Sequence, residues 1–356
     1  MIKKIIFTFL ALAMLISLCA CNKKTTYEPI ASSEEEMTTV FRIGKYDVPY
    51  ELFRTFFLTN KKSLDENNAS NWIGDTASEY RQKAIDEIMP QILDVYAMFS
   101  MCESYGIDIN GEKVTSAVNE YVKLSVEGGM IGDVAVMGHE SYDDYIAHLK
   151  TLYMNDSVSR LLIKYSVCEE LLREKFFSEY KYDKSDVEEF YYSNECAHIT
   201  WMNILFENTQ YLKLSEMRTL AEKAHSKLAG AKNQKEVINI FVQHSAGASA
   251  SEIENGFYIG KYTLDSAYMA DIIDAAFSQK AGEYSDLIEN DNGFYIIYKM
   301  EKDSTYLDVK ANYEEIEELY LNNQLYRALE EYKSRLSESV SYSSFFNSLN
   351  FAEISY

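Results

Sequence analysis

Apolar residues recur at three- and four-residue spacing along much of the chain between residues 50 and 192. Such runs are Leu52, Phe53, Phe56 and Phe57, then Ile85, Ile88, Ile92 and Tyr96, then Leu161, Leu162, Tyr165 and Leu172. This spacing puts the side chains on one face of a helix and predicts a set of amphipathic helices. The 356 residues include only three prolines and 14 glycines, which favours long helices.

A different pattern precedes these helices. Residues 40–49 alternate apolar and polar side chains around Gly44-Lys45, which predicts a short β-hairpin followed by a helix from about Tyr50. Residues 22–38 carry almost no apolar side chains, as is typical of a solvated tether.

From Cys196 onward the pattern is mixed. Strands are predicted over residues 198–206, 256–262 and 293–298, and helices over 214–229, 235–243 and the stretch from Ile272 to Phe277. This order predicts a compact α+β domain over residues 194–303.

After Asp303 the helical pattern returns, with Tyr313, Ile316, Tyr320 and Leu325 on one face. Because an apolar face must be covered, we expect this segment to dock on the N-terminal helices. The predicted domains are therefore a helical domain over residues 40–193, the α+β domain, and residues 304–356, which complete the helical domain.

The first 21 residues have the pattern of an export signal: Lys3 and Lys4, an apolar run from Ile5 to Leu18, and Cys21. The run of about 14 residues is shorter than the ~20 that a membrane span needs. Leu18-Cys19-Ala20-Cys21 resembles the lipobox of bacterial lipoproteins, which implies that residues 1–20 are removed and that Cys21 is lipidated. Residues 21–39 would then tether the protein to the extracytoplasmic face of the bacterial cell membrane.

The formal net charge of −22 restricts the partners of the chain. Removing residues 1–20 takes away two lysines and no acid, which leaves −24. Such an acidic surface repels phosphates, which argues against nucleic-acid binding and against membrane attachment through basic patches. Cys102, Cys168 and Cys196 lack metal-ligand spacing, so we predict no metal site and no cofactor, and expect three small buried residues.

Five short motifs follow one another in the order found in the parvulin type of peptidyl-prolyl isomerase domain, and residues 195–302 resemble that family. The family's His-Ile-Leu corresponds to His198-Ile199-Thr200 in this chain, and its Gly-Gly-Asp-Leu-Gly to Gly256-Phe257-Tyr258-Ile259-Gly260. Its Phe-x-x-Ala-x-Phe corresponds to Ile272 to Phe277, and its Gly-Glu-x-Ser to Gly282-Glu283-Tyr284-Ser285. Its last motif, Gly-Tyr-His-Ile-Ile, corresponds to Gly293 to Ile297. The resemblance implies a four-stranded antiparallel sheet with surrounding helices.

The flanking segments, residues 41–48 and 103–107, resemble the N-terminal region of extracytoplasmic foldases of the PrsA and SurA type. In that family an all-helical chaperone domain is built from both chain ends around an inserted parvulin domain. The resemblance implies an α+β protein that binds unfolded or newly translocated polypeptides, with prolyl isomerisation as its activity.

Prolyl isomerisation breaks no covalent bond, so it needs only an apolar slot for the ring and polar groups that favour the twisted amide. The resemblance implies that the slot is lined by Ile259, Tyr268, Met269, Ile272 and Phe277.

The resemblance also places the family's two facing histidines at His198 and Tyr295, which are the implied catalytic pair. The family's Cys or Asp falls at Ala246 or Gly247. Because two of the three polar positions differ from the family, the sequence leaves open whether the domain isomerises prolyl bonds or only binds peptides.

Two other functions agree with an acidic exported lipoprotein. A solute-binding lipoprotein of a transporter would need two α/β lobes, although residues 50–190 show almost no strand pattern. A non-catalytic scaffold in envelope assembly is the other function.

His244 beside Ser245 does not indicate a hydrolase, because sequence neighbours point apart and no orienting Asp is apparent. Homodimerisation is left open.

Overall fold

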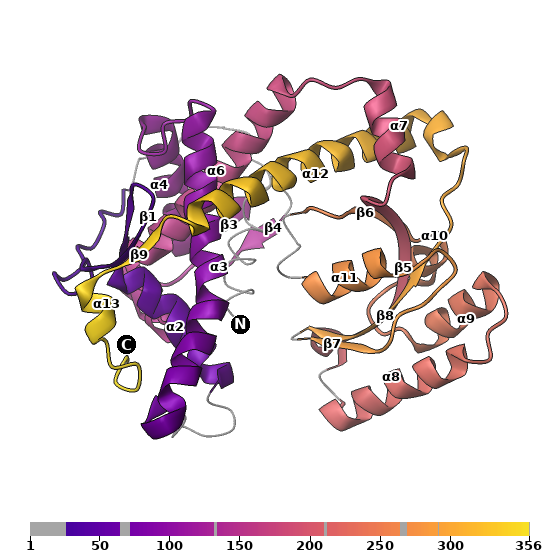
Figure 1. Ribbon diagram of the computed structural model, residues 1–356, viewed down its shortest axis with the longest axis horizontal. Helices are drawn as coiled ribbons and strands as arrows, with labels where there is room; N and C mark the ends of the chain where they lie inside the picture. Colours follow the sequence, from indigo (N-terminus) through magenta and orange to yellow (C-terminus); the bar gives the residue numbers. More distant parts are fainter. Residues whose placement is uncertain are drawn as a thin grey trace. The chain divides into compact units, whose positions relative to one another are not determined.

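The computed structural model describes residues 26–64, 72–131, 134–209, 212–263, 269–290 and 292–355. The chain divides into two compact units (Figure 1). The first contains residues up to Glu179 together with Ala328–Tyr356, and the second contains Tyr180–Arg327. Helix α12 (Lys310–Ser337) contributes residues to both units.

Long helices dominate the first unit, as the apolar spacing predicts. They are α2 (Tyr50–Leu64), α3 (Ala77–Ser104), α4 (Glu112–Glu127), α5 (Tyr142–Thr151) and α6 (Asp156–Glu179), with a 3-10 turn at Gly74–Thr76. α6 packs against both α3 and α4. The buried face of α3 includes Ile88, Ile92 and Tyr96 at the predicted spacing. None of the helices in the described residues is long and apolar enough to cross a bilayer.

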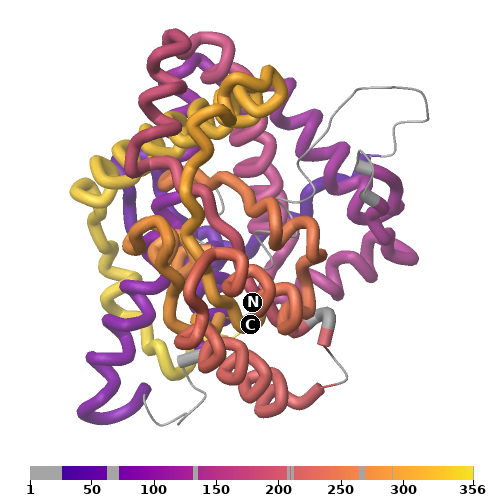
Figure 2. Tube along the Cα trace, turned by 90° about the vertical axis from the view of Figure 1, so that its right-hand side faces the viewer, coloured from indigo at the N-terminus to yellow at the C-terminus, as the bar shows by residue number. Residues whose placement is uncertain are grey.

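A three-stranded antiparallel sheet joins the two ends of the first unit. Strand β1 (Thr39–Ile43) lies between β2 (Tyr46–Pro49) and β9 (Val340–Tyr342). Figures 1 and 2 show the yellow C-terminal segment beside the indigo N-terminal strands. The sequence predicted the β1–β2 hairpin but not β9, because three residues are too few for a periodic signal.

Aromatic rings from both chain ends pack together next to this sheet. Phe346 of α13 (Ser344–Ser348) meets Phe41 of β1 and Phe53 of α2 edge to face, with ring centroids 6.0 and 5.5 Å apart. All three side chains are buried. Their removal from water holds the C-terminal segment against the first strand and helix.

Residues 27–36 are bound to the helices of the first unit, whereas the sequence predicted that they belong to a solvated tether. The Ile30 N–H donates to Asp156 over 3.0 Å, and Glu36 accepts from Arg54 over 2.7 Å. The Ser32 hydroxyl donates to Glu51, which is buried. Hydrogen bonds and ion pairs hold this segment, and these need no apolar side chains. A segment with so few apolar residues therefore looks solvated from its composition alone. Cys21 and the signal segment lie outside the described residues.

A two-stranded hairpin interrupts the helices of the first unit, where the sequence showed only helix-ending glycines. Strands β3 (Gly129–Ile131) and β4 (Val134–Val136) follow α4 directly and pair antiparallel. At the base of the hairpin, a Cβ added to Gly138 would lie 2.4 Å from the Gly128 nitrogen. The two segments can approach this closely only because both residues are glycine.

One four-stranded antiparallel sheet organises the second unit, in the order β6-β5-β8-β7. The strands are β5 (Cys196–Leu205), β6 (Phe257–Gly260), β7 (Ile288–Asn290) and β8 (Gly293–Lys299). The helices are α7 (Lys184–Tyr192), α8 (Leu214–Leu228), α9 (Gln234–His244), α10 (Ala250–Asn255) and α11 (Ala270–Ser278), with 3-10 turns at Phe206–Thr209 and Tyr306–Asp308. The chain is therefore α+β, and the sequence located β5, β6 and β8 to within a few residues.

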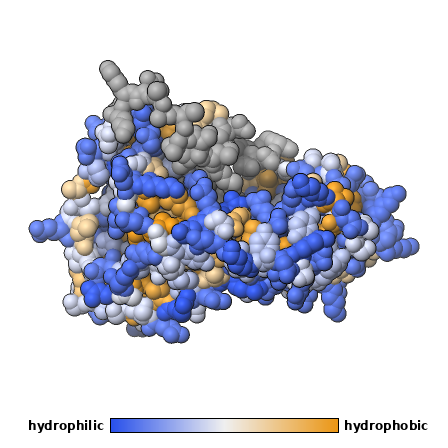
Figure 3. All heavy atoms as spheres, turned by 90° about the horizontal axis from the view of Figure 1, so that it is seen from above, coloured by the Kyte–Doolittle hydropathy of each residue, from blue (hydrophilic) through white to orange (hydrophobic). Residues whose placement is uncertain are grey.

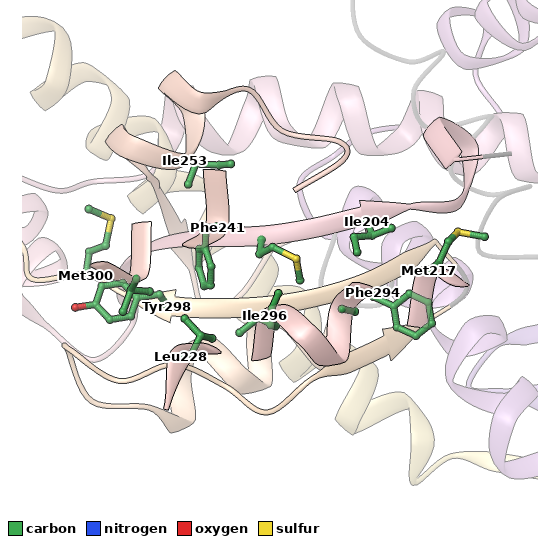
Figure 4. Packing of buried hydrophobic residues seen from close by; sticks show 13 residues of the cluster. Ile204, Met217, Leu228, Phe241, Ile253, Phe294, Ile296, Tyr298 and Met300 are labelled. Carbon is green, nitrogen blue, oxygen red and sulfur yellow. The ribbon is translucent and has the colours of Figure 1, made fainter. Parts of the chain in front are cut away.

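Different helices cover the two faces of this sheet. α8, α9 and α10 pack on one face through an apolar cluster that includes Phe241, Phe294 and Ile296 (Figure 4). α11 packs on the other face through Ile272 and Ala276. Because strand side chains alternate, neighbours along β5 and β8 belong to different faces.

α7 and the first half of α12 belong to the second unit, although the sequence predicted both as parts of the helical domain. Phe190 of α7 packs on Tyr320 of α12, with ring centroids 5.6 Å apart. The Tyr191 hydroxyl donates to the Asp303 carbonyl over 2.8 Å and lies 2.9 Å from the Tyr258 hydroxyl. The boundary between the two units therefore falls at Tyr180 and not at residue 194. The sequence misplaced it because an amphipathic pattern shows that a helix face is covered but not which element covers it.

We predict that Phe346→Ala destabilises the first unit by about 3–5 kcal/mol, because it opens a cavity between β1 and α2. Phe345→Ala is the control: Phe345 is half-buried, and we expect a loss of about 1 kcal/mol. Urea unfolding followed by far-ultraviolet circular dichroism measures both. Equal effects of the two substitutions would show that Phe346 does not hold the chain ends together.

Candidate functional site

The register between β5 and β8 brings two polar residues face to face. Asn203 of β5 pairs with Tyr295 of β8, and both side chains are at least 95% buried. Directly opposed residues in an antiparallel pair lie on the same face, with Cβ atoms about 5 Å apart. Asn203 and Tyr295 therefore share the face of the sheet that α11 covers in part.

The segment after α9 adds a hydroxyl to this pair. The Ser245 Oγ lies 2.7 Å from the Asn203 Oδ1 and accepts from the Asn203 main-chain N–H over 3.1 Å. The Ala246 N–H donates to the Asn203 carbonyl over 2.7 Å, which ties the same segment to β5. These contacts fix the orientation of the Asn203 side chain.

Gly247 continues this segment alongside Asn203. A Cβ added at Gly247 would lie 2.8 Å from the Leu205 Cγ and 2.9 Å from the Asn203 Oδ1. Real Cβ atoms do not come this close, so a Cys or Asp at this position would displace its neighbours. Gly247, one of the two positions that the resemblance gives for the third polar side chain, therefore has no room for it; the other is Ala246.

A half-buried apolar surface surrounds the polar pair. Ile259 of β6, Met269 before α11, and Ile272 and Phe277 of α11 all belong to the cluster that contains Tyr295. The structure thus brings together four of the five residues that the resemblance implied for the proline slot. The fifth, Tyr268, lies outside the described residues.

Two aromatic residues that the sequence did not single out extend this surface. The Trp201 ring packs on Phe257 with centroids 4.7 Å apart and on Tyr295 with centroids 5.8 Å apart. Trp201 and Phe257 are both partly exposed. Together with Ile259 and Met269, they extend the apolar surface beside Tyr295 and add two aromatic rings to it.

His198 does not meet Tyr295, so the implied catalytic pair is wrong in this respect. His198 lies five residues from Asn203 along β5 and therefore points to the opposite face. Its Nδ1 lies 3.1 Å from the Glu301 carbonyl and its Nε2 2.9 Å from the Asn255 carbonyl. The ring also stacks on Tyr258, with centroids 4.4 Å apart. His198 therefore holds three backbone segments together.

Sequence reasoning missed Asn203 and Ser245 because it matched the family's His-Ile-Leu to His198-Ile199-Thr200. Asn203-Ile204-Leu205 preserves both apolar residues of that motif and replaces only the histidine. A requirement that the first motif face Tyr295 across the sheet selects this second match. The apolar residues Ile204 and Leu205 indicated the correct match, but the histidine at position 198 favoured the wrong one.

Among the other nucleophilic and basic groups described in the second unit, Lys299 approaches the apolar surface, with its Nζ 5.6 Å from the ring centroid of Phe277. The His244 Nε2 lies 2.9 Å from the Lys227 Nζ, while the adjacent Ser245 turns to Asn203. Burial and the nearby lysines lower the pKa of His244. Burial raises the pKa of the Cys196 thiol to about 12, so it stays protonated. Over the described ranges, no three His, Cys, Asp or Glu side chains cluster as metal ligands would.

The site combines an uncharged polar pair with an apolar surface. An amide and a phenol can each donate and accept a hydrogen bond. Both side chains are at least 95% buried and the Asn203 Oδ1 accepts from Ser245, so the pair lies beneath the apolar surface and supports its shape. Rotation about a prolyl amide requires no proton transfer, and low polarity around the amide lowers its barrier. The arrangement therefore suits an apolar peptide segment with a proline ring.

We predict that Gly247→Ala destabilises the second unit by about 1–3 kcal/mol, because its methyl group collides with Leu205 and Asn203. Gly230→Ala is the matched control, since the nearest atom to its added Cβ is 3.6 Å away. Thermal unfolding of both variants tests this. A Gly247→Ala variant as stable as Gly230→Ala would contradict the close packing beside Asn203.

Similarity to known proteins is limited to solved structures. No protein-family model and no curated protein matches the chain. PrsA from Bacillus subtilis is 19% identical over 73% of this chain and 87% of its own, with a TM-score of 0.26. Foldase protein PrsA from Streptococcus pneumoniae is 14% identical over 75% and 90%, with a TM-score of 0.31. Foldase protein PrsA from Lactococcus lactis is 11% identical over 90% and 100%, with a TM-score of 0.25. The chain is similar to these PrsA foldases, and we base its function on the geometry of its own site.

Proposed function

We propose that this chain is an extracytoplasmic foldase that binds unfolded exported polypeptides and carries a prolyl-peptide site on the second unit. The facing pair Asn203 and Tyr295, bordered by Trp201, Phe257 and Ile259, is the observation that carries the proposal. A proline ring fits the partly exposed apolar surface, and the buried polar pair beneath it supports its shape. In this proposal the four-stranded sheet with its helices is a parvulin-like domain.

Exposed apolar side chains support a chaperone function for the rest of the molecule. Figure 3 shows hydrophobic residues between hydrophilic ones on one face. Ile73 of the first unit is 67% exposed and Leu214 of the second is 51% exposed. Such residues can hold an unfolded chain transiently, and the net negative charge keeps the protein soluble while it does so.

The sheet topology argues against the solute-binding alternative. A solute-binding protein of the two-lobed kind needs parallel strands joined by crossover helices in each lobe. In the described part of the chain, every strand pair within the three sheets is antiparallel. A foldase, or a scaffold that only binds peptides, agrees with this topology.

We predict that the wild type accelerates cis/trans exchange in a short proline peptide and that Tyr295→Phe lowers kcat/KM about tenfold, through loss of the hydrogen-bonding phenol beneath the apolar surface. Tyr298→Phe is the matched control, because Tyr298 lies on the same strand but in the apolar cluster of the opposite face. NMR exchange spectroscopy measures the rates.

The same variants separate catalysis from binding. Tyr295→Phe is expected to suppress aggregation of an unfolded protein as well as the wild type does, because the apolar surface is unchanged. No acceleration of exchange by the wild type would eliminate the catalytic part of the proposal, and the peptide-binding scaffold would take its place. Equal acceleration by the wild type, Tyr295→Phe and Tyr298→Phe would remove the role of Tyr295.

Attachment to the membrane is proposed to depend on a lipid at Cys21. We predict that Cys21→Ser releases the protein from the membrane fraction and abolishes incorporation of a labelled fatty acid, because the lipid alone provides attachment. Cys19→Ser is the control and should remain bound. Membrane retention of the Cys21→Ser variant would contradict lipid anchoring at this residue.

A further inference from the structure

The N-terminal segment of the first unit, residues 27–36, is fixed at the end of helix α4. The Tyr27 hydroxyl donates to Glu127, the last residue of α4, over 3.1 Å. The Tyr27 carbonyl accepts from Arg160 over 2.6 Å, and its ring packs on Tyr142 with centroids 5.0 Å apart. The point at which the chain leaves the helical unit toward Cys21 is therefore defined.

The β3–β4 hairpin begins at the same place. Gly129 follows Glu127 by two residues, and the His139 N–H donates to the Val126 carbonyl over 2.8 Å to close its base. Met137, directly after β4, is 90% exposed, and Met130 of β3 is 57% exposed. Met137 is the most exposed large hydrophobic side chain in the described part of the molecule.

Chain length limits how far this hairpin can lie from an anchor at Cys21. Six residue steps separate Cys21 from Tyr27, and at about 3.6 Å per step they span at most about 22 Å. A tether of residues 21–39 would have allowed more than twice that reach, but residues 27–36 are bound to the helices. The base of the hairpin is therefore close to the attachment point.

We propose that the β3–β4 hairpin contacts the lipid bilayer and inserts Met130 and Met137 into its interface, which orients the helical unit on the membrane. This inference rests on the proposed lipid anchor at Cys21. Two methionines are too few to hold a protein on a membrane alone, but a short tether keeps them at a high local concentration beside it.

The charges around the hairpin indicate the kind of contact. Glu127, Glu140 and Asp143 lie near its base and are solvent-exposed. These carboxylates outnumber Lys123, whose Nζ lies 4.0 Å from Glu127, so charge at the base of the hairpin gives little attraction to anionic headgroups. Insertion should therefore be apolar and should occur on zwitterionic lipid.

A tryptophan at the hairpin reports on this contact. The mature chain, starting at Cys21, is coupled through that thiol to maleimide lipid in phosphatidylcholine vesicles that contain a doxyl-labelled quencher lipid. The remaining cysteines, Cys102, Cys168 and Cys196, are buried and do not compete. Met137→Trp is compared with Ile73→Trp, a residue of similar apolar character that is 67% exposed on the same unit. The emission of the unsubstituted chain is subtracted from both.

We expect the quencher lipid to reduce the emission of Met137→Trp at least twofold more than that of Ile73→Trp. A 30-residue Gly-Ser insertion between Cys21 and Tyr27 should lower this difference several-fold, because it dilutes the hairpin near the surface. Equal quenching of the two variants would overturn the proposal. A response of Met137→Trp to an unfolded polypeptide, or to dimerisation, with none to vesicles would also overturn it.

Chemical coupling keeps this test independent of natural lipidation. If Cys21→Ser stays membrane-bound in cells, the anchor proposal fails and the hairpin contact that rests on it falls with it, whatever the quenching on vesicles. If Cys21→Ser is released and no quenching difference is seen, the anchor stands and the hairpin contact fails.

Discussion

Antiparallel pairing between β5 and β8 is the interaction on which the candidate site depends. It runs from Ile199 to Leu205 and sets Asn203 opposite Tyr295. A shift of one residue would exchange the two faces of β5 and would put Asn203 into the apolar cluster beneath α8 and α9. That cluster therefore fixes the register, since burial of Met202, Ile204 and Phe294 stabilises only one pairing.

The first unit is held by two kinds of contact with different consequences. Aromatic packing of Phe346 and the pairing of β9 with β1 join the two chain ends. Hydrogen bonds to buried carboxylates, Glu51 and Asp156, hold the segment that leads to Cys21. A buried carboxylate that loses these donors becomes costly, so the segment is expected to stay in place. The effective tether is consequently shorter than the composition suggests.

The proposed prolyl isomerisation would tolerate a polar centre unlike that of the parvulin family, because the reaction moves no proton. Asn203 and Tyr295 keep hydrogen-bonding capacity without a titratable imidazole. Trp201 and Phe257 add aromatic area to the apolar surface beside Tyr295. A foldase built in this way would depend more on binding and shape than on charge, and its activity would change little with pH near neutrality.

The sequence by itself determined the elements with strong periodicity, namely the helices of residues 50–192 and the strands β5, β6 and β8. The apolar residues Ile259, Met269, Ile272 and Phe277 around the site were implied by the resemblance to parvulins and not by spacing. Local spacing reports which residues are buried, because burial follows the helical and strand periods. Only the tertiary structure decided which side chains face one another and which helices cover which face. Asn203 rather than His198 faces Tyr295, α7 packs with the sheet unit, and residues 27–36 bind to the helices. These outcomes depend on the register between strands distant in sequence and on specific hydrogen bonds, neither of which leaves a periodic trace along the chain.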